Sequence, residues 1–157
     1  MFRFIYPFVV LTYVVVVAEN KTINDTLPSF LQGESQEVID QFKAILGTAH
    51  DKSDPQVDAE ITKFVNEKGG ELKKKYEVFR AEIQKEIEIG KKAHQKAYEK
   101  FSPEAKKIDR ELTAIANNNQ LTGQEKLKRF AEIMKNMPNS VREEIQKAMK
   151  AASESPQ

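Results

Sequence analysis

A run of apolar residues at helical spacing dominates the middle of this 157-residue chain. Its members follow one another at intervals of three or four, the repeat that places side chains on one face of an α-helix. A single helix over about 71–101 would be about 45 Å long. We expect this stripe to face the core, so several shorter helices have to cover it. The stripe consists of Leu72, Tyr76, Phe79, Ile83, Ile87, Gly90, His94, Ala97 and Phe101.

Helix start and stop signals divide the rest of the chain into shorter helices. Asp54-Pro55 and Ser102-Pro103 each combine a capping residue with a proline suited to the first turn. Thr122 and Ser140 each begin a capping box, and Gly69-Gly70 interrupts the pattern before the long helix. No segment alternates as a strand does. We predict an all-α fold of about six helices, with one long central helix packed by the shorter ones.

The chain begins with the features of a secretory signal. Arg3 supplies a positive start, and an apolar run follows from Phe4 to Val17. This run is shorter than the roughly 20 residues that span a membrane. Val16-Val17-Ala18 offers compact side chains to a signal peptidase. We predict cleavage after Ala18 and secretion to the extracellular space without stable membrane insertion; the alternative is an uncleaved membrane anchor.

Four parts follow from these patterns. Residues 1–18 form the signal peptide, and residues 19–33 form a polar leader whose few apolar residues lie against the domain. Residues 34–152 form a single helical domain, and residues 153–157 form a disordered tail. Asn20 and Asn24 each begin an acceptor pattern for N-glycosylation inside the leader, so we expect a glycoprotein.

Composition excludes several classes of function. The absence of cysteine rules out disulfides, thiolate metal sites and thiol catalysis. The loss of Arg3 with the signal leaves 24 basic and 24 acidic residues, without the basic excess typical of a nucleic-acid binder. We therefore predict no nucleic-acid partner.

Four segments follow one another along the chain: residues 27–33 (LPSFLQG), 69–73 (GGELK), 101–106 (FSPEAK) followed by Asp109, and 121–122 (LT) with 137–145 (MPNSVREEI). In order and spacing they resemble the nematode SXP/RAL family of secreted antigens. The match spans roughly residues 27–149, which is most of the mature chain. The resemblance implies a helical, secreted nematode antigen without catalytic activity, which is exposed to a host and so to host proteins. It also implies a cation-binding domain.

An acidic segment between residues 51 and 60 is the best candidate for metal binding. Counted from Asp51, the sixth and twelfth positions of an EF-hand loop fall on Gln56 and Thr62, so the EF-hand pattern fails. Four carboxylates could still gather weakly around a hard cation such as Mg²⁺ or Ca²⁺. The alternative is that these acids only favour the dipole of a helix start. The candidate ligands are Asp51, Asp54, Asp58 and Glu60.

No catalytic constellation accompanies the two histidines. His50 lies beside Asp51 in a predicted loop, and His94 falls on the apolar stripe, where a histidine is typically buried and hydrogen-bonded. The chain carries no nucleophile elbow, so we predict no enzymatic activity and no catalytic residues.

The aromatic and methionine residues leave a second function open. Phe79 and Ile83 of the stripe, with Phe42, Phe130 and Met134 from other helices, are residue types that adapt to apolar ligands. The simpler interpretation is that they form the core. The alternative is a carrier or binding module for an apolar small molecule or a partner helix, which requires an apolar groove in the folded protein.

Overall fold

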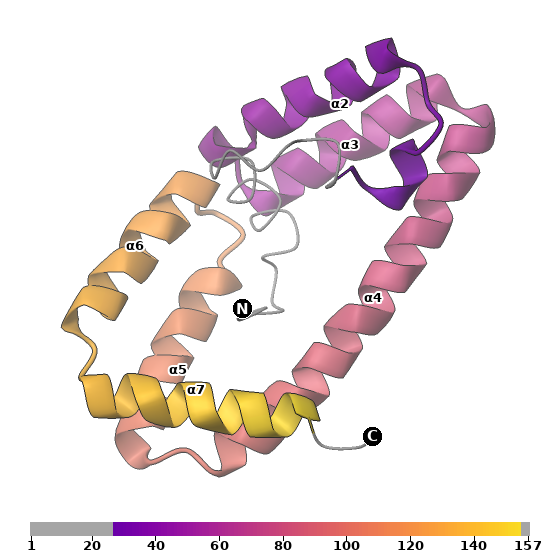
Figure 1. Cartoon of the computed structure of the whole chain (residues 1–157). Coiled ribbons are helices and arrows are strands. Elements are labelled where there is room, and N and C mark those ends of the chain that lie inside the picture. The colour runs from indigo at the N-terminus through magenta and orange to yellow at the C-terminus, as the bar shows by residue number, and fades with distance from the viewer. Residues whose placement is uncertain (1–26, 155–157) are drawn as a thin grey trace.

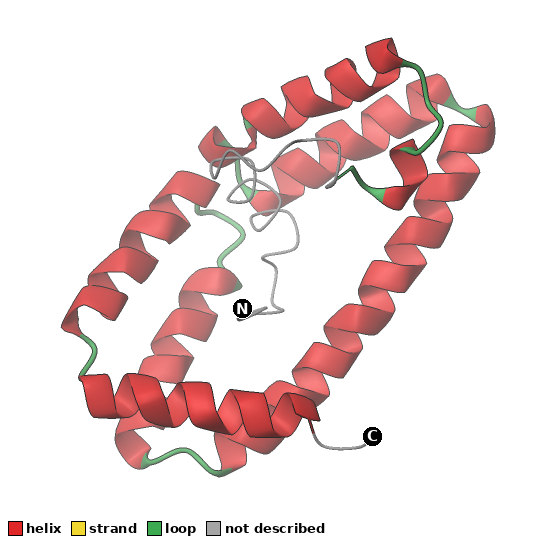
Figure 2. Cartoon of the chain, viewed as in Figure 1, coloured by secondary structure: helices red, strands yellow, loops and turns green. Residues whose placement is uncertain are grey.

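The computed structural model describes residues 27–154, and these residues are almost entirely helical (Figures 1 and 2). Within this range the chain forms six α-helices and no strand beyond an isolated bridge between Ser53 and Thr122. The predicted all-α class and the predicted number of helices are therefore confirmed. The elements are η2 (Ser29–Leu31), α2 (Gln36–Gly47), η3 (Ala49–Asp51), α3 (Asp54–Lys68), α4 (Gly70–Glu99), α5 (Pro103–Ala116), α6 (Gly123–Asn136) and α7 (Asn139–Glu154).

Capping residues begin two of the helices where the sequence signals predict, and a third helix is capped one residue earlier. The Glu125 carboxylate accepts a hydrogen bond from the Thr122 backbone N–H at 2.8 Å. The Glu125 backbone N–H donates to the Thr122 hydroxyl at 3.2 Å. The Ser102 hydroxyl caps α5 as predicted. Asp54, the expected cap of its helix, is instead the first residue of α3, and Ser53 is the cap, whose backbone N–H donates to Gln56 Oε1 at 2.9 Å. These bonds satisfy N–H groups that have no partner within the helix.

The last helix begins two residues before the predicted position, which would be Val141 after a Ser140 cap. α7 begins at Asn139, so Ser140 lies inside the helix. The Arg142 backbone N–H donates to the Pro138 carbonyl at 3.0 Å. This bond closes the first turn before Ser140 can cap it.

The glycine pair separates α3 from α4 as predicted. Gly69 and Gly70 have φ angles of +61° and +52°, in the left-handed region that favours glycine. A side chain at Gly70 would meet nothing within 4 Å. The backbone conformation of the turn, and not a lack of space, therefore requires glycine here.

The buried apolar residues form two separate clusters near the two ends of α4. The first joins η2, α2 and α3 to the start of α4, and the second joins the end of α4 to α5 and α7. The first cluster contains Phe30, Leu31, Phe42, Ala49, Val57, Ile61, Phe64, Val65, Leu72 and Tyr76. The second contains Ala97, Phe101, Ala105, Met137, Val141, Ile145 and Ala152.

The stripe on α4 is deeply buried only towards its ends. The shorter helices pack around its first and last turns, which leaves Phe79, Ile83 and Ile87 half-buried between the clusters. The expectation of one continuous core along the stripe is therefore wrong for its middle. The helix spans Gly70–Glu99 instead of about 71–101, yet Phe101 beyond its end is only 4% exposed.

A second connection joins the two clusters on the side away from α4. The start of α6 lies against η3 and the start of α3, so the helices form a closed, elongated frame (Figure 1). Lys126 of α6 donates to the Asp54 carboxylate at 2.6 Å and to the Ala116 carbonyl at 2.9 Å. The Gly123 N–H donates to the Lys52 carbonyl at 3.0 Å. We call the meeting point of Asp54, Ala116 and Lys126 the α3–α5–α6 junction.

Both chain ends of the described range differ from the predicted boundaries. Phe30 and Leu31 are 1% and 0% exposed in the first cluster, as expected of leader residues that lie against the domain, and the folded part therefore begins before residue 34. Residues 19–26 of the predicted leader lie outside the described residues. α7 continues to Glu154, and residues 155–157 of the predicted tail also lie outside them.

We predict that two phenylalanines of the stripe differ in their effect on stability. Phe101→Ala should lower the free energy of unfolding by about 3–5 kcal/mol, because it leaves a cavity in a closed cluster. Phe79→Ala should cost only about 1.5–3 kcal/mol, since its half-buried ring borders open space and leaves no sealed cavity. Urea unfolding of the two variants measures the difference. Equal losses would show that the middle of the stripe is as well packed as its end.

Candidate functional site

The four predicted metal ligands lie beside four different basic side chains. Asp54 pairs with Lys126 at 2.6 Å. Glu60 pairs with Lys52 at 2.6 Å, and Asp58 pairs with Arg80 of α4 at 3.4 Å. Asp51 lies 3.1 Å from His50, with both side chains exposed. Lysine or arginine side chains of the protein itself therefore neighbour three of the four carboxylates, and an imidazole neighbours Asp51.

The structure does not bring these carboxylates together as one ligand set. Within residues 27–154, no three His, Cys, Asp or Glu side chains gather closely enough to hold a metal ion. A weak site that uses Asp51, Asp54, Asp58 and Glu60 stays a prediction. Its formation would require the present ion pairs to separate.

His94 occupies the structural position that the sequence predicts. Its Nε2 lies 2.8 Å from the Asp109 carboxylate of α5, and the two side chains are 20% and 10% exposed. The ring also lies against Tyr98, with centroids 6.2 Å apart. This pair ties α4 to α5 beside the second cluster.

An apolar groove follows the middle of α4, where the stripe is half-buried. It has a volume of about 290 Å³, near the lower limit of the roughly 300–1,000 Å³ typical of small-molecule sites. Phe30 provides part of the floor, and its ring contacts Phe42, Tyr76 and Phe79 at centroid distances of 5.1–5.3 Å. The lining residues are Pro28, Phe30, Phe42, Leu46, Asp54, Asp58, Ile61, Tyr76, Phe79, Arg80, Ile83, Gln84 and Ile87.

The charged groups on the rim of this groove are paired with one another or with Lys126 of the α3–α5–α6 junction. Arg80 pairs with Asp58, and Asp54 pairs with Lys126. Burial raises the pKa of the Tyr76 phenol, although the positive charge of Arg80 opposes the shift. Tyr76 is therefore neutral at physiological pH. The groove offers a ligand apolar walls and no unpaired charge.

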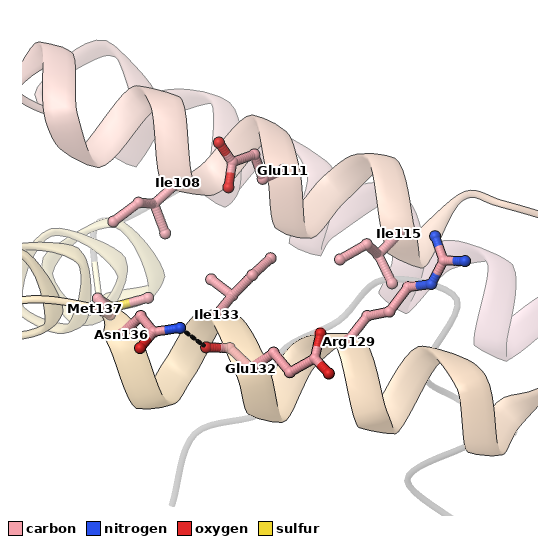
Figure 3. Close-up of a pocket in the computed structure, with 8 residues that line it drawn as sticks. All are labelled: Ile108, Glu111, Ile115, Arg129, Glu132, Ile133, Asn136 and Met137. Atoms are coloured by element: carbon pink, nitrogen blue, oxygen red, sulfur yellow. Dashed lines mark hydrogen bonds between the residues drawn. The ribbon is translucent and has the colours of Figure 1, made fainter.

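A second, shallower groove follows the seam between α5 and α6 (Figure 3). Its volume is about 520 Å³, and isoleucine side chains from the two helices point into it. α6 buries only Gly123 and Lys126 and none of its apolar side chains. Ile133 packs half-buried against the second cluster, and polar contacts at the start of the helix also hold it. The lining residues are Ile108, Glu111, Ile115, Arg129, Glu132, Ile133, Asn136 and Met137.

Lys126 is the residue that the sequence interpretation overlooked. Its side chain is 3% exposed, although lysine is almost never fully buried without a partner. A signal was present, because Lys126, Phe130, Ile133 and Met137 follow one another at helical spacing. A lysine on the inward face of an amphipathic helix predicts a buried ion pair. The identity of its partner, 72 positions earlier, requires the fold.

Several predicted features lie outside the described residues. They include the signal peptide with its cleavage after Ala18 and the glycosylation sites Asn20 and Asn24. None of the described helices is long and apolar enough to cross a membrane.

Comparison with known proteins identifies the family. A model described as the SXP/RAL-2 family protein Ani s 5-like, metal-binding domain matches residues 1–157. The chain is 38% identical over 123 residues to the SXP/RAL-2 family protein Ani s 5 of Anisakis simplex. The aligned residues make up 78% of this chain and 80% of that protein. The chain is 37% identical over 123 residues to the OV-17 antigen of Onchocerca volvulus, covering 78% and 75% of the two chains. No solved structure matches. The resemblance seen in the sequence is therefore confirmed, and the chain belongs to the SXP/RAL-2 family.

Proposed function

We propose that this SXP/RAL-2 protein is a secreted, non-enzymatic binding protein that carries a neutral apolar small molecule in the groove along α4. The observation that carries the proposal is the half-buried middle of the stripe, where Phe79, Ile83 and Ile87 line the groove. When a ligand covers apolar side chains that are partly in water, the free energy of the system falls.

The charges on the rim favour a neutral ligand. Asp58 already neutralises Arg80 at 3.4 Å, and Lys126 neutralises Asp54 at 2.6 Å. A charged head group would have to break one of these pairs or enter the groove without a partner, and both cost free energy. A long-chain alcohol fits this chemistry better than a fatty-acid carboxylate.

Other parts of the proposal rest on the sequence and the family. Secretion is supported by the predicted signal at residues 1–18 and by the antigen name of a relative. The absence of enzymatic activity is supported by the same name and by the lack of a catalytic motif in the sequence. That host proteins are partners stays a prediction. Weak binding of Mg²⁺ or Ca²⁺ has less support, because each carboxylate of the predicted set already has a basic partner.

We predict that groove substitutions weaken binding of the neutral dye Nile red. Ile87→Gln should raise its dissociation constant about tenfold, which corresponds to the loss of about 1.4 kcal/mol of apolar contact. Ile89→Gln is the matched control, because Ile89 lies on the same helix, is 39% exposed and does not line the groove. A fluorescence titration of both variants measures the effect.

A displacement experiment tests the neutral character of the ligand. Dodecanol should displace Nile red from the wild-type protein at lower concentrations than dodecanoate does. Equal effects of Ile87→Gln and Ile89→Gln would contradict the groove as the binding site. Stronger displacement by dodecanoate would contradict the preference for a neutral head group.

We predict that the secreted protein begins at Glu19 or within two residues of it. Signal peptidase would remove residues 1–18 during export. Mass spectrometry of the protein from culture medium, after glycan removal, identifies the first residue. Recovery of the intact chain with Met1 in a membrane fraction would show an anchor instead.

A further inference from the structure

The α3–α5–α6 junction surrounds a buried positive charge with oxygen atoms. The Lys126 ammonium contacts Asp54 Oδ2 at 2.6 Å and the Ala116 carbonyl at 2.9 Å, and its side chain is 3% exposed. Ala116 is the last residue of α5, where helix carbonyls lack partners and the helix dipole places negative charge. A carboxylate and a backbone carbonyl are also the oxygen ligands that Ca²⁺ takes in proteins.

We infer that the Lys126 ammonium is the resident cation of this junction, in the place where a divalent metal ion would otherwise neutralise Asp54. Closure of the frame then depends on a covalently attached charge and does not depend on Mg²⁺ or Ca²⁺. This inference differs from the metal-binding description of the family model. The residues at the junction do not fit a divalent ion while Lys126 is present.

Electrostatics explains why the lysine and a metal ion exclude one another. A divalent ion on Asp54 would lie within a few ångströms of the buried ammonium, and the two positive charges would repel one another. The ammonium would have to leave, and Lys126 would then lose both of its oxygen partners. A buried charge without a partner is costly, so the bound metal would have to offset that loss.

The neighbouring carboxylates do not provide a way around this exclusion. Glu60 is held by Lys52 at 2.6 Å, and Lys52 also donates to the Thr48 hydroxyl at 2.8 Å. Asp58 is held by Arg80 from α4. A metal ion shared by Asp54, Asp58 and Glu60 would therefore have to displace three separate cations of the protein.

Substitution of Lys126 tests the inference directly. Lys126→Met keeps an unbranched side chain of similar length and removes the charge, and Lys128→Met is the control at an exposed position of the same helix. Asp54→Asn removes the carboxylate. Thermal midpoints are recorded with MgCl₂ or CaCl₂ up to about 10 mM, well above the dissociation constants of weak calcium modules. NaCl at matched ionic strength separates specific binding from screening.

The wild-type protein and Lys128→Met should show no saturable rise in midpoint with either metal. Lys126→Met should melt at a lower temperature and recover part of the loss as Mg²⁺ or Ca²⁺ is added. Asp54→Asn introduced into Lys126→Met should abolish that recovery. If Lys126→Met does not fold, NMR titration of the wild type decides, and the amides of residues 52–60 and 116–126 should not shift saturably.

Two results would overturn the inference. One is a saturable stabilisation of the wild type by Mg²⁺ or Ca²⁺ that Asp54→Asn removes, which would show that a metal ion binds while Lys126 is present. The other is a Lys126→Met variant that melts at the wild-type temperature, or whose lowered thermal midpoint does not rise when metal is added. Either result would show that the junction is not a cation-binding site.

Discussion

The contact between the buried Lys126 and the partly exposed Asp54 closes the frame on which the other features of this protein depend. α4 connects the two apolar clusters along one side, and the α3–α5–α6 junction connects them along the other (Figure 1). α6 buries none of its apolar side chains, so the junction contributes much of what fixes the helix in place. A buried ion pair often adds little stability compared with apolar packing, but breaking one partner costs about 3–5 kcal/mol. Such a pair specifies one arrangement of the helices.

The same contact links the frame to the groove. Asp54 lines the groove and also accepts the hydrogen bond from Lys126. Neutralisation of this carboxylate by Lys126, and of Asp58 by Arg80, leaves the groove without unpaired charge on its rim. The proposed preference for a neutral ligand and the inferred exclusion of divalent cations therefore rest on one physical feature, the pairing of acids with bases from other helices.

Local patterns in the sequence predicted most of the helices, while contacts between distant segments remained hidden. The Thr122–Glu125 capping box and the Gly69-Gly70 turn depend on a few neighbouring residues, so sequence reasoning located them correctly. The half-burial of Phe79, Ile83 and Ile87 depends on where the shorter helices pack, which periodicity along α4 does not contain. The acidic set was predicted from its own residues alone. Its basic partners Lys126 and Arg80 come from other helices, and only the fold brings them close.

A double-mutant cycle on Lys126 and Asp54 tests the closure of the frame most directly. The free energy of unfolding is measured by urea denaturation for the wild type, Lys126→Met, Asp54→Asn and the double variant. Each single substitution should be strongly destabilising, and the double variant should lose much less than their sum. We expect a coupling free energy of about 2–3 kcal/mol between Lys126 and Asp54, in the upper part of the range for residues in direct contact. Losses that add within about 0.5 kcal/mol would contradict it, because additivity is the behaviour of residues that do not interact.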